Sequence, residues 1–143
     1  MSLSSIGCVI VGTTHFVNAV IQRSPSLCHV AVVRLCGGPD NGFGRGIPPF
    51  VDFPADLCAC IKSSRTYFCH GGYQISGNEI SALDEVEIRR VAAELVEDQI
   101  SNVVVSGMYG PLNNAQETTA KTILLKYMAE YGGMDFKPRI TLS

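Results

Sequence analysis

The chain has 143 residues, of which 46% are hydrophobic and 17% are charged, and its formal net charge is −2. This length corresponds to one domain, and the apolar content is too high for a disordered or acidic tail, which cannot repay the entropy lost on ordering. The near-zero charge argues against a nucleic-acid partner, and no apolar run reaches the roughly 20 residues that span a bilayer. We expect residues 1–6 to be an added remnant or a disordered start, and residues 7–143 to form a single α/β domain.

The first third of the sequence predicts a strand, a helix and a second strand. Residues 7–11 are a short apolar, β-branched run that ends at Gly12. Thr13 or Thr14 can cap a helix in which apolar residues recur at helical spacing over 16–21, and residues 29–35 form a second β-rich run. This order is typical of a βαβ-like unit.

The middle of the chain is dominated by a loop. Glycines and prolines are frequent over 36–53, and a loop of this length inside a compact domain is usually functional or mobile. Pro54 can start a short helix that runs to residue 61. We expect strands at 67–69 and 73–75, followed by a hairpin turn at 76–78 that leads into residues 79–80.

The second half has the clearest pattern. Asp84 with Glu87 three residues later is the spacing of a capping box, and an amphipathic helix follows, with Glu85–Arg89 and Glu87–Arg90 pairs expected on its solvent face. Residues 102–106 read as a buried strand, a helix begins after 113–114 and ends at 132–133, and residues 138–142 form a last strand. Apolar strands that alternate with amphipathic helices predict an α/β fold with a largely parallel sheet covered by helices.

Six cysteines lie at positions 8, 28, 36, 58, 60 and 69. The chain is too long and too apolar to need disulfides, so we expect buried free thiols in a reducing cytoplasm. Cys58 and Cys60 form a lone CxC without a second pair at metal-ligand spacing, and we therefore predict no metal site.

The first strand-to-helix junction is the best candidate for a ligand site. Gly12 permits a tight turn, the hydroxyls of Thr13 and Thr14 and the first helical N–H groups can bind a phosphate or carboxylate, and Asn18 lies one turn further on. The segment is neither a Walker loop nor a dinucleotide fingerprint. The alternative is that a threonine only caps the helix.

Two histidines are second-line candidates. His70 precedes Gly71 and Gly72 between two expected strands, which would let it stand beside a site, although it has no evident partner in the sequence. His15 follows the threonines. A small-molecule hydrolase that uses Cys69 as nucleophile with His70 is a weaker alternative, because no base is evident beside a cysteine.

A series of short motifs in a fixed order resembles the N-terminal region of the hydantoinase/oxoprolinase family, of the hydantoin utilisation protein A type. The similarity begins near Gly7 and covers nearly the whole chain. The motifs are Val11-Gly-Thr-Thr-His-Phe-Val-Asn-Ala-Val20, Arg34-Leu-Cys-Gly37, Pro48-Pro-Phe-Val-Asp52, His70-Gly-Gly72, Asn78-Glu-Ile80, Leu83-Asp-Glu85 and Ile140-Thr-Leu-Ser143.

The resemblance implies a cytoplasmic, ATP-dependent enzyme that opens a cyclic amide such as a hydantoin or 5-oxoproline. It implies one lobe of an actin-like (ribonuclease H-like) ATPase, with ATP and Mg²⁺ as cofactors of the complete enzyme. Gly12, Thr13, Thr14 and Asn18 match the family's GTTxxxNA segment near the cleft, whereas Val17 replaces a threonine that many relatives carry.

The family's two phosphate motifs have no counterpart in this sequence. We therefore expect a piece of a hydantoinase-like enzyme that binds no cofactor and is inactive alone. The alternative is a non-catalytic binding or assembly module that forms a homo-oligomer or binds a partner subunit.

Overall fold

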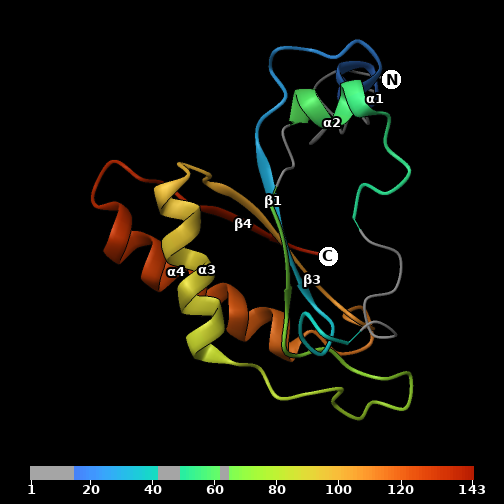
Figure 1. The fold of residues 1–143 in the computed structure, drawn as a ribbon, viewed down its shortest axis with the longest axis vertical. Helices are drawn as coiled ribbons and strands as arrows, with labels where there is room; N and C mark the ends of the chain where they lie inside the picture. Colours follow the sequence, from blue (N-terminus) through green and yellow to red (C-terminus); the bar gives the residue numbers. More distant parts are fainter. Residues whose placement is uncertain (1–14, 42–48, 62–64) are drawn as a thin grey trace, which may run out of the picture.

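The computed structural model describes residues 15–41, 49–61 and 65–143. Helices and strands alternate in these ranges (Figure 1). Their order is α1 (His15–Ile21), β1 (Val30–Leu35), α2 (Ala55–Ile61), β2 (Thr66–Cys69), α3 (Glu85–Glu97), β3 (Asn102–Gly107), α4 (Ala115–Gly132) and β4 (Arg139–Leu142). The expected first strand at 7–11 and residues 42–48 of the central loop lie outside the described residues.

The four strands form one parallel sheet in the order β2-β1-β3-β4. β1 and β3 are the central pair of strands, and their register pairs Val30 with Asn102 and Leu35 with Gly107. Runs of valine suit these positions because β-branched side chains pack well on a pleated, buried surface. The prediction of an α/β fold with a largely parallel sheet is therefore confirmed, whereas the actin-like assignment stays a prediction.

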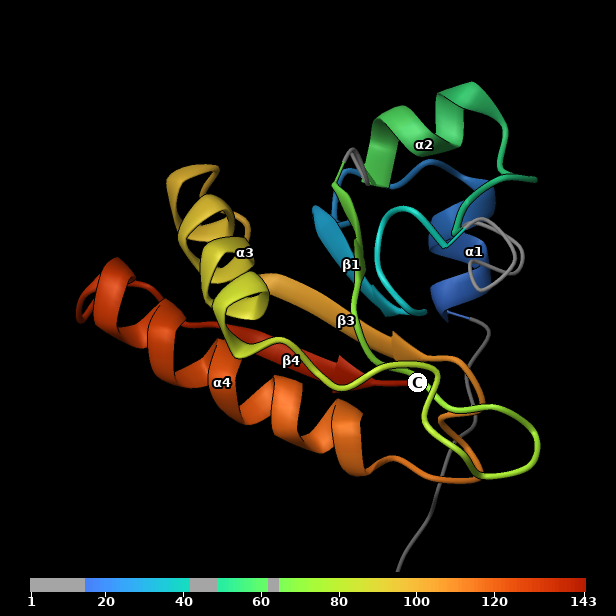
Figure 2. The same cartoon turned by 60° about the horizontal axis from the view of Figure 1, so that its bottom comes forward.

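The hydrophobic core lies between this sheet and the helices α3 and α4. Figure 2 shows the two helices side by side along one face, while α1 and α2 lie away from them. The core cluster draws on alternate residues of β1 and β3 and on one stripe of each of the two helices, which matches the 2.0 and 3.6 periodicities of these elements. Its members include Ala31, Val33, Leu35, Val103, Val105, Ile88, Val91, Leu95, Ala120, Leu124 and Met128.

Three local predictions on residues 73–90 are corrected. Residues 73–75 form no strand, because Tyr73 and Glu79 make only an isolated antiparallel bridge around a turn in which Gly77 has φ +85°. The expected pairs on α3 are also wrong. Arg89 donates to the hydroxyl of Tyr131 at 2.8 Å, and Arg90 lies 4.0 Å from Glu94, one helical turn further on.

None of the five described cysteines takes part in a disulfide, as expected. Cys36 and Cys69 are buried, but Cys28 is exposed and Cys58 and Cys60 are only partly buried, so burial was predicted wrongly for these three residues.

Candidate functional site

Three short turns meet at the carboxyl edge of the sheet. They follow β1, β2 and β3 at residues 36–38, 70–73 and 108–110. Backbone hydrogen bonds join them, because Gly37 N donates to Gly71 O at 2.9 Å and Tyr73 N donates to Met108 O at 3.0 Å. Open parallel sheets bind their ligands outside the carboxyl ends of the strands. This edge is therefore the part of the described chain where a site is expected.

Glycine is required at position 72, where the turn after β2 approaches the end of β1 closely. Gly72 has φ +88°, and a Cβ at this position would lie 2.6 Å from the carbonyl oxygen of Leu35. The left-handed conformation and this close approach both exclude a side chain. The dipeptide after His70 thus brings the turn close to β1, as the sequence suggested.

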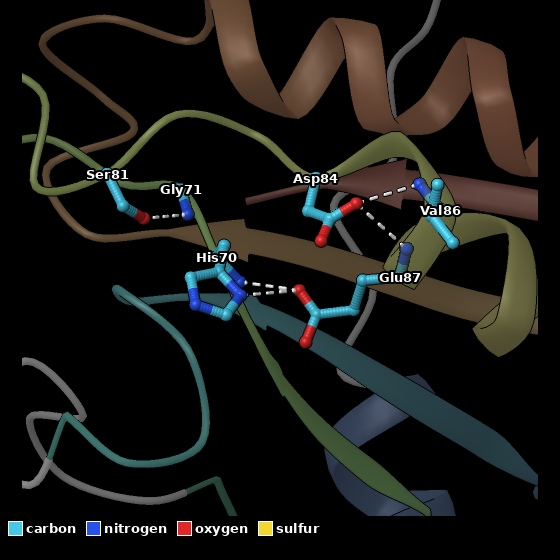
Figure 3. Close-up of polar contacts among 6 residues, drawn as sticks. All are labelled: His70, Gly71, Ser81, Asp84, Val86 and Glu87. Atoms are coloured by element: carbon cyan, nitrogen blue, oxygen red, sulfur yellow. Dashed lines mark hydrogen bonds and ion pairs between the residues drawn. The ribbon is translucent and has the colours of Figure 1, made fainter.

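His70, directly after β2, has a carboxylate partner. Its backbone N–H donates to Glu87 Oε2 at 2.8 Å, and its ring atom Nδ1 lies 3.1 Å from the same oxygen (Figure 3). The Glu87 side chain is only 9% exposed, whereas the imidazole is 46% exposed. The sequence indicated no partner for His70, and this prediction is wrong, because Glu87 in the first turn of α3 is its partner.

The start of α3 explains why the sequence missed this pair. Asp84 is the N-cap, and its carboxylate accepts from Val86 N at 2.9 Å and from Glu87 N at 3.2 Å, as predicted. In a capping box the Glu87 carboxylate would turn back to the Asp84 backbone. Here Glu87 points toward His70 instead (Figure 3). Only the Asp84 half of the capping box is confirmed.

A carboxylate beside an imidazole is an arrangement that can move a proton. With the proton on Nδ1 facing Glu87, the other ring nitrogen, Nε2, is an acceptor. His70, Asp84, Val86, Glu87 and Arg90 line a cavity of about 190 Å³. Gly38 lies against the ring, since a Cβ there would come within 2.7 Å of Nε2. The pair can therefore act as a base or hold a hydrogen-bonded ligand at the end of β2.

The first turn of α4 reaches the same edge. Glu117 is 1% exposed, and its Oε1 accepts from Gly107 N at 2.6 Å and from the Ser143 hydroxyl at 3.0 Å. Its Oε2 is buried without a hydrogen-bond partner among the described residues. Gln116 accepts from Gly72 N at 2.6 Å. Neither residue was predicted from the sequence, although two polar side chains in the first turn of the helix that follows β3 were a usable signal.

Cys69 is a poor nucleophile in this structure. It is 1% exposed, and burial raises the pKa of its thiol well above the usual range, with a further contribution from the nearby Glu87 charge. A thiol of this kind remains protonated at neutral pH, whereas a nucleophilic cysteine needs a lowered pKa. The hydrolase that uses Cys69 with His70 is therefore disfavoured.

The other predicted site residues lie at the start of the chain. Gly12, Thr13 and Thr14 are outside the described residues, so the proposed anion site stays a prediction. His15 begins α1, and Asn18 lies on the same helix with an exposed side chain.

In the described ranges, no group of three or more His, Cys, Asp or Glu side chains is arranged to hold a metal ion. Within the same ranges, no helix combines the length and the apolar character needed to cross a membrane.

Comparison with known proteins identifies one family. A family model described as the hydantoinase/oxoprolinase N-terminal region matches residues 1–128. No curated protein and no solved structure matches the chain. The match agrees with the resemblance found in the sequence motifs, and it covers the three turns at the carboxyl edge of the sheet and most of α4.

Proposed function

Because the chain belongs to the hydantoinase/oxoprolinase family, we propose that it takes part in the ATP-dependent opening of a cyclic amide in the cytoplasm. A hydantoin or 5-oxoproline ring is the substrate class that the family resemblance implies. The observation that carries this proposal is the family match over residues 1–128. ATP with Mg²⁺ would activate the amide carbonyl when bound.

The carboxyl edge of the sheet is the part of the chain that we propose to face the ligand. His70, held by Glu87, is suited to accept a proton from the attacking water through Nε2. We propose that Gly12, Thr13, Thr14 and Asn18 lie near the substrate or the phosphates, because they match the GTTxxxNA segment. The backbone hydrogen bonds between the turns after β1, β2 and β3 hold the carboxyl ends of these three strands in fixed relative positions.

We propose further that this chain does not turn over a cyclic amide alone. The resemblance implies an ATPase that holds phosphates between two lobes, and the described residues form a single sheet. One lobe supplies only part of such a phosphate site. The chain would then work together with other lobes of the enzyme or with a partner subunit.

Isothermal titration calorimetry of the chain with Mg·ATP, and separately with 5-oxoproline and hydantoin, tests these proposals. We expect measurable binding of a cyclic amide, weak binding of Mg·ATP, and no ring opening in a product assay. A cyclic amide that binds to wild type but not to His70→Gln would support the edge as the site. Lys121→Gln, a change on α4, is the matched control. Absence of any binding by cyclic amides would contradict the proposed function, and tight Mg·ATP binding would contradict the single-lobe argument.

Exposed apolar side chains favour a second candidate, an assembly module without catalysis. Val17 and Ile21 on α1 are 52% and 66% exposed, and Val51 and Phe53 just before α2 are 58% and 45% exposed. Such side chains are typical of surfaces that pair with another chain. Size-exclusion chromatography with light scattering would show a dimer that Ile21→Glu separates into monomers. A wild-type monomer at all concentrations would exclude self-pairing.

A further inference from the structure

Arg34 lies on the face of the sheet that points away from α3 and α4. Its neighbours in β1, Val33 and Leu35, belong to the core cluster on the helix-covered face. Side chains alternate along a strand, so Arg34 projects to the opposite face. There it pairs in register with Ser106 of β3 and Phe68 of β2, close to the carboxyl edge.

The guanidinium of Arg34 has only neutral partners. Nη1 donates to the Ser106 hydroxyl at 2.5 Å, and Nη2 donates to the sulfur of Met108 at 3.1 Å. Its third nitrogen, Nε, is buried and has no hydrogen-bond partner among the described residues. A thioether is a weak acceptor and carries no charge, so the positive charge of Arg34 is not balanced by these contacts.

No side-chain carboxylate of the chain compensates this charge. All 13 Asp and Glu residues lie in the described ranges. Within these ranges the acidic partners of arginines are Asp56 for Arg23, Asp98 for Arg65 and Glu94 for Arg90. Arg34 is partly buried on a central strand, and none of these ion pairs includes it.

A partly buried arginine without an anion is costly to the folded protein. Buried charges are normally paired, because removal from water is not repaid by neutral contacts. The planar guanidinium is also the group best suited to hold a carboxylate or a phosphate through two parallel hydrogen bonds. Met108, which contacts Arg34, also lines a cavity of about 380 Å³ together with Asn41, Tyr73 and Tyr109.

We propose that Arg34 is an anion-binding residue that holds the carboxylate or phosphate group of a ligand beside the ends of β1 and β3. In its ligand chemistry, this inference rests on the proposed function. A cyclic amide that carries a carboxylate, such as 5-oxoproline, or a nucleotide phosphate presents the required group. Unsubstituted hydantoin does not.

The test is calorimetry with three probes: inorganic phosphate, 5-oxoproline and hydantoin. We expect wild type to bind at least one of the two anions, and Arg34→Met to weaken that binding about tenfold or more, as expected for loss of hydrogen bonds to a charged group. Arg34→Lys keeps the charge but loses the planar fork, so its affinity should be intermediate. The matched control is Arg65→Met, which removes an arginine that Asp98 already pairs, and binding should be unchanged.

Several outcomes overturn the inference. They are failure of wild type to bind either anion, and equal binding by wild type and Arg34→Met. Circular dichroism establishes whether Arg34→Met folds. If it does not fold, the proposal is tested with Arg34→Lys, and anion binding by this variant equal to that of wild type counts against the proposal. Binding of 5-oxoproline indicates a carboxylate site, whereas binding of inorganic phosphate indicates a phosphate site.

The result also separates this inference from the proposed function. If phosphate binds through Arg34 but neither 5-oxoproline nor hydantoin binds, the cyclic-amide function fails and the anion site stands. If hydantoin binds equally to wild type and Arg34→Met while neither anion binds, the anion site fails and the function stands.

Discussion

Replacement of Glu117 by alanine is expected to destabilise the chain substantially. The Glu117 carboxylate accepts from the buried Gly107 N–H and from the Ser143 hydroxyl. Ser143 is exposed and can turn to water, but Gly107 is buried and would keep an unsatisfied donor. Such a donor costs about 1–3 kcal/mol. The cavity left by the side chain adds to this cost, and removal of the unpartnered Oε2 offsets part of it.

We therefore expect Glu117→Ala to lower the free energy of unfolding by about 2–3 kcal/mol, a large part of the 5–15 kcal/mol typical of a domain. Urea unfolding measures this loss of free energy, provided that the m-value is the same for the variant and the wild type. Glu117→Gln keeps an oxygen for Gly107 N and a side chain of the same size, so it should stay within about 1 kcal/mol of wild type. A loss below about 0.5 kcal/mol for alanine, or an equal loss for both variants, would refute the role assigned to Oε1.

Three further predictions concern other groups. Asp84→Ala removes the N-cap of α3 and should cost about 1 kcal/mol in thermal unfolding, whereas Asp84→Asn, which can still cap, should cost much less. Cys69 should resist iodoacetamide in the folded protein while the exposed Cys28 reacts, and mass spectrometry of the modified peptides checks this order. Burial, with the Glu94 charge nearby, raises the pKa of Tyr67 to about 12. Because the unfolded chain releases this proton near pH 10, stability should fall as pH rises from about 10 to 12, and Tyr67→Phe should flatten that fall.

The sequence predicts elements well where a local pattern decides them. The valine runs of β1 and β3, the stripe of α3 and the Asp84 cap are properties of a few adjacent residues, and each is confirmed. The strand predicted at 73–75 is absent because Tyr73 N donates to Met108 O, just after β3, and residues 73–75 make only one bridge to the other side of the hairpin. Competition from a distant segment is not visible in a local pattern.

The first candidate site from the sequence was the junction at 12–14, which lies outside the described residues, and His70 was named only as a second-line candidate. The sequence correctly placed His70 and the following glycines at a strand end, but its partner Glu87 lies 17 residues away in the first turn of a helix. The spacing from Asp84 to Glu87 fits a capping box equally well, and only the position of β2 beside α3 decides between the two. The acceptors on Gln116 and Glu117 depend in the same way on which turns meet at the edge of the sheet.

The hydrogen bonds between the three turns have a mechanical consequence. Gly71 O accepts from Gly37 N at 2.9 Å and Met108 O accepts from Tyr73 N at 3.0 Å, so the turn at 70–73 is bonded to each of the other two turns, while Met108 N donates at 2.9 Å to the carbonyl oxygen of Leu35, the last residue of β1. A ligand that pushes the turn after β1 or the turn after β3 outward must stretch the bond of that turn to residues 70–73. The carboxyl edge therefore yields as one stiff rim, and a load applied at the His70 end is transmitted to the end of β3 beside Arg34.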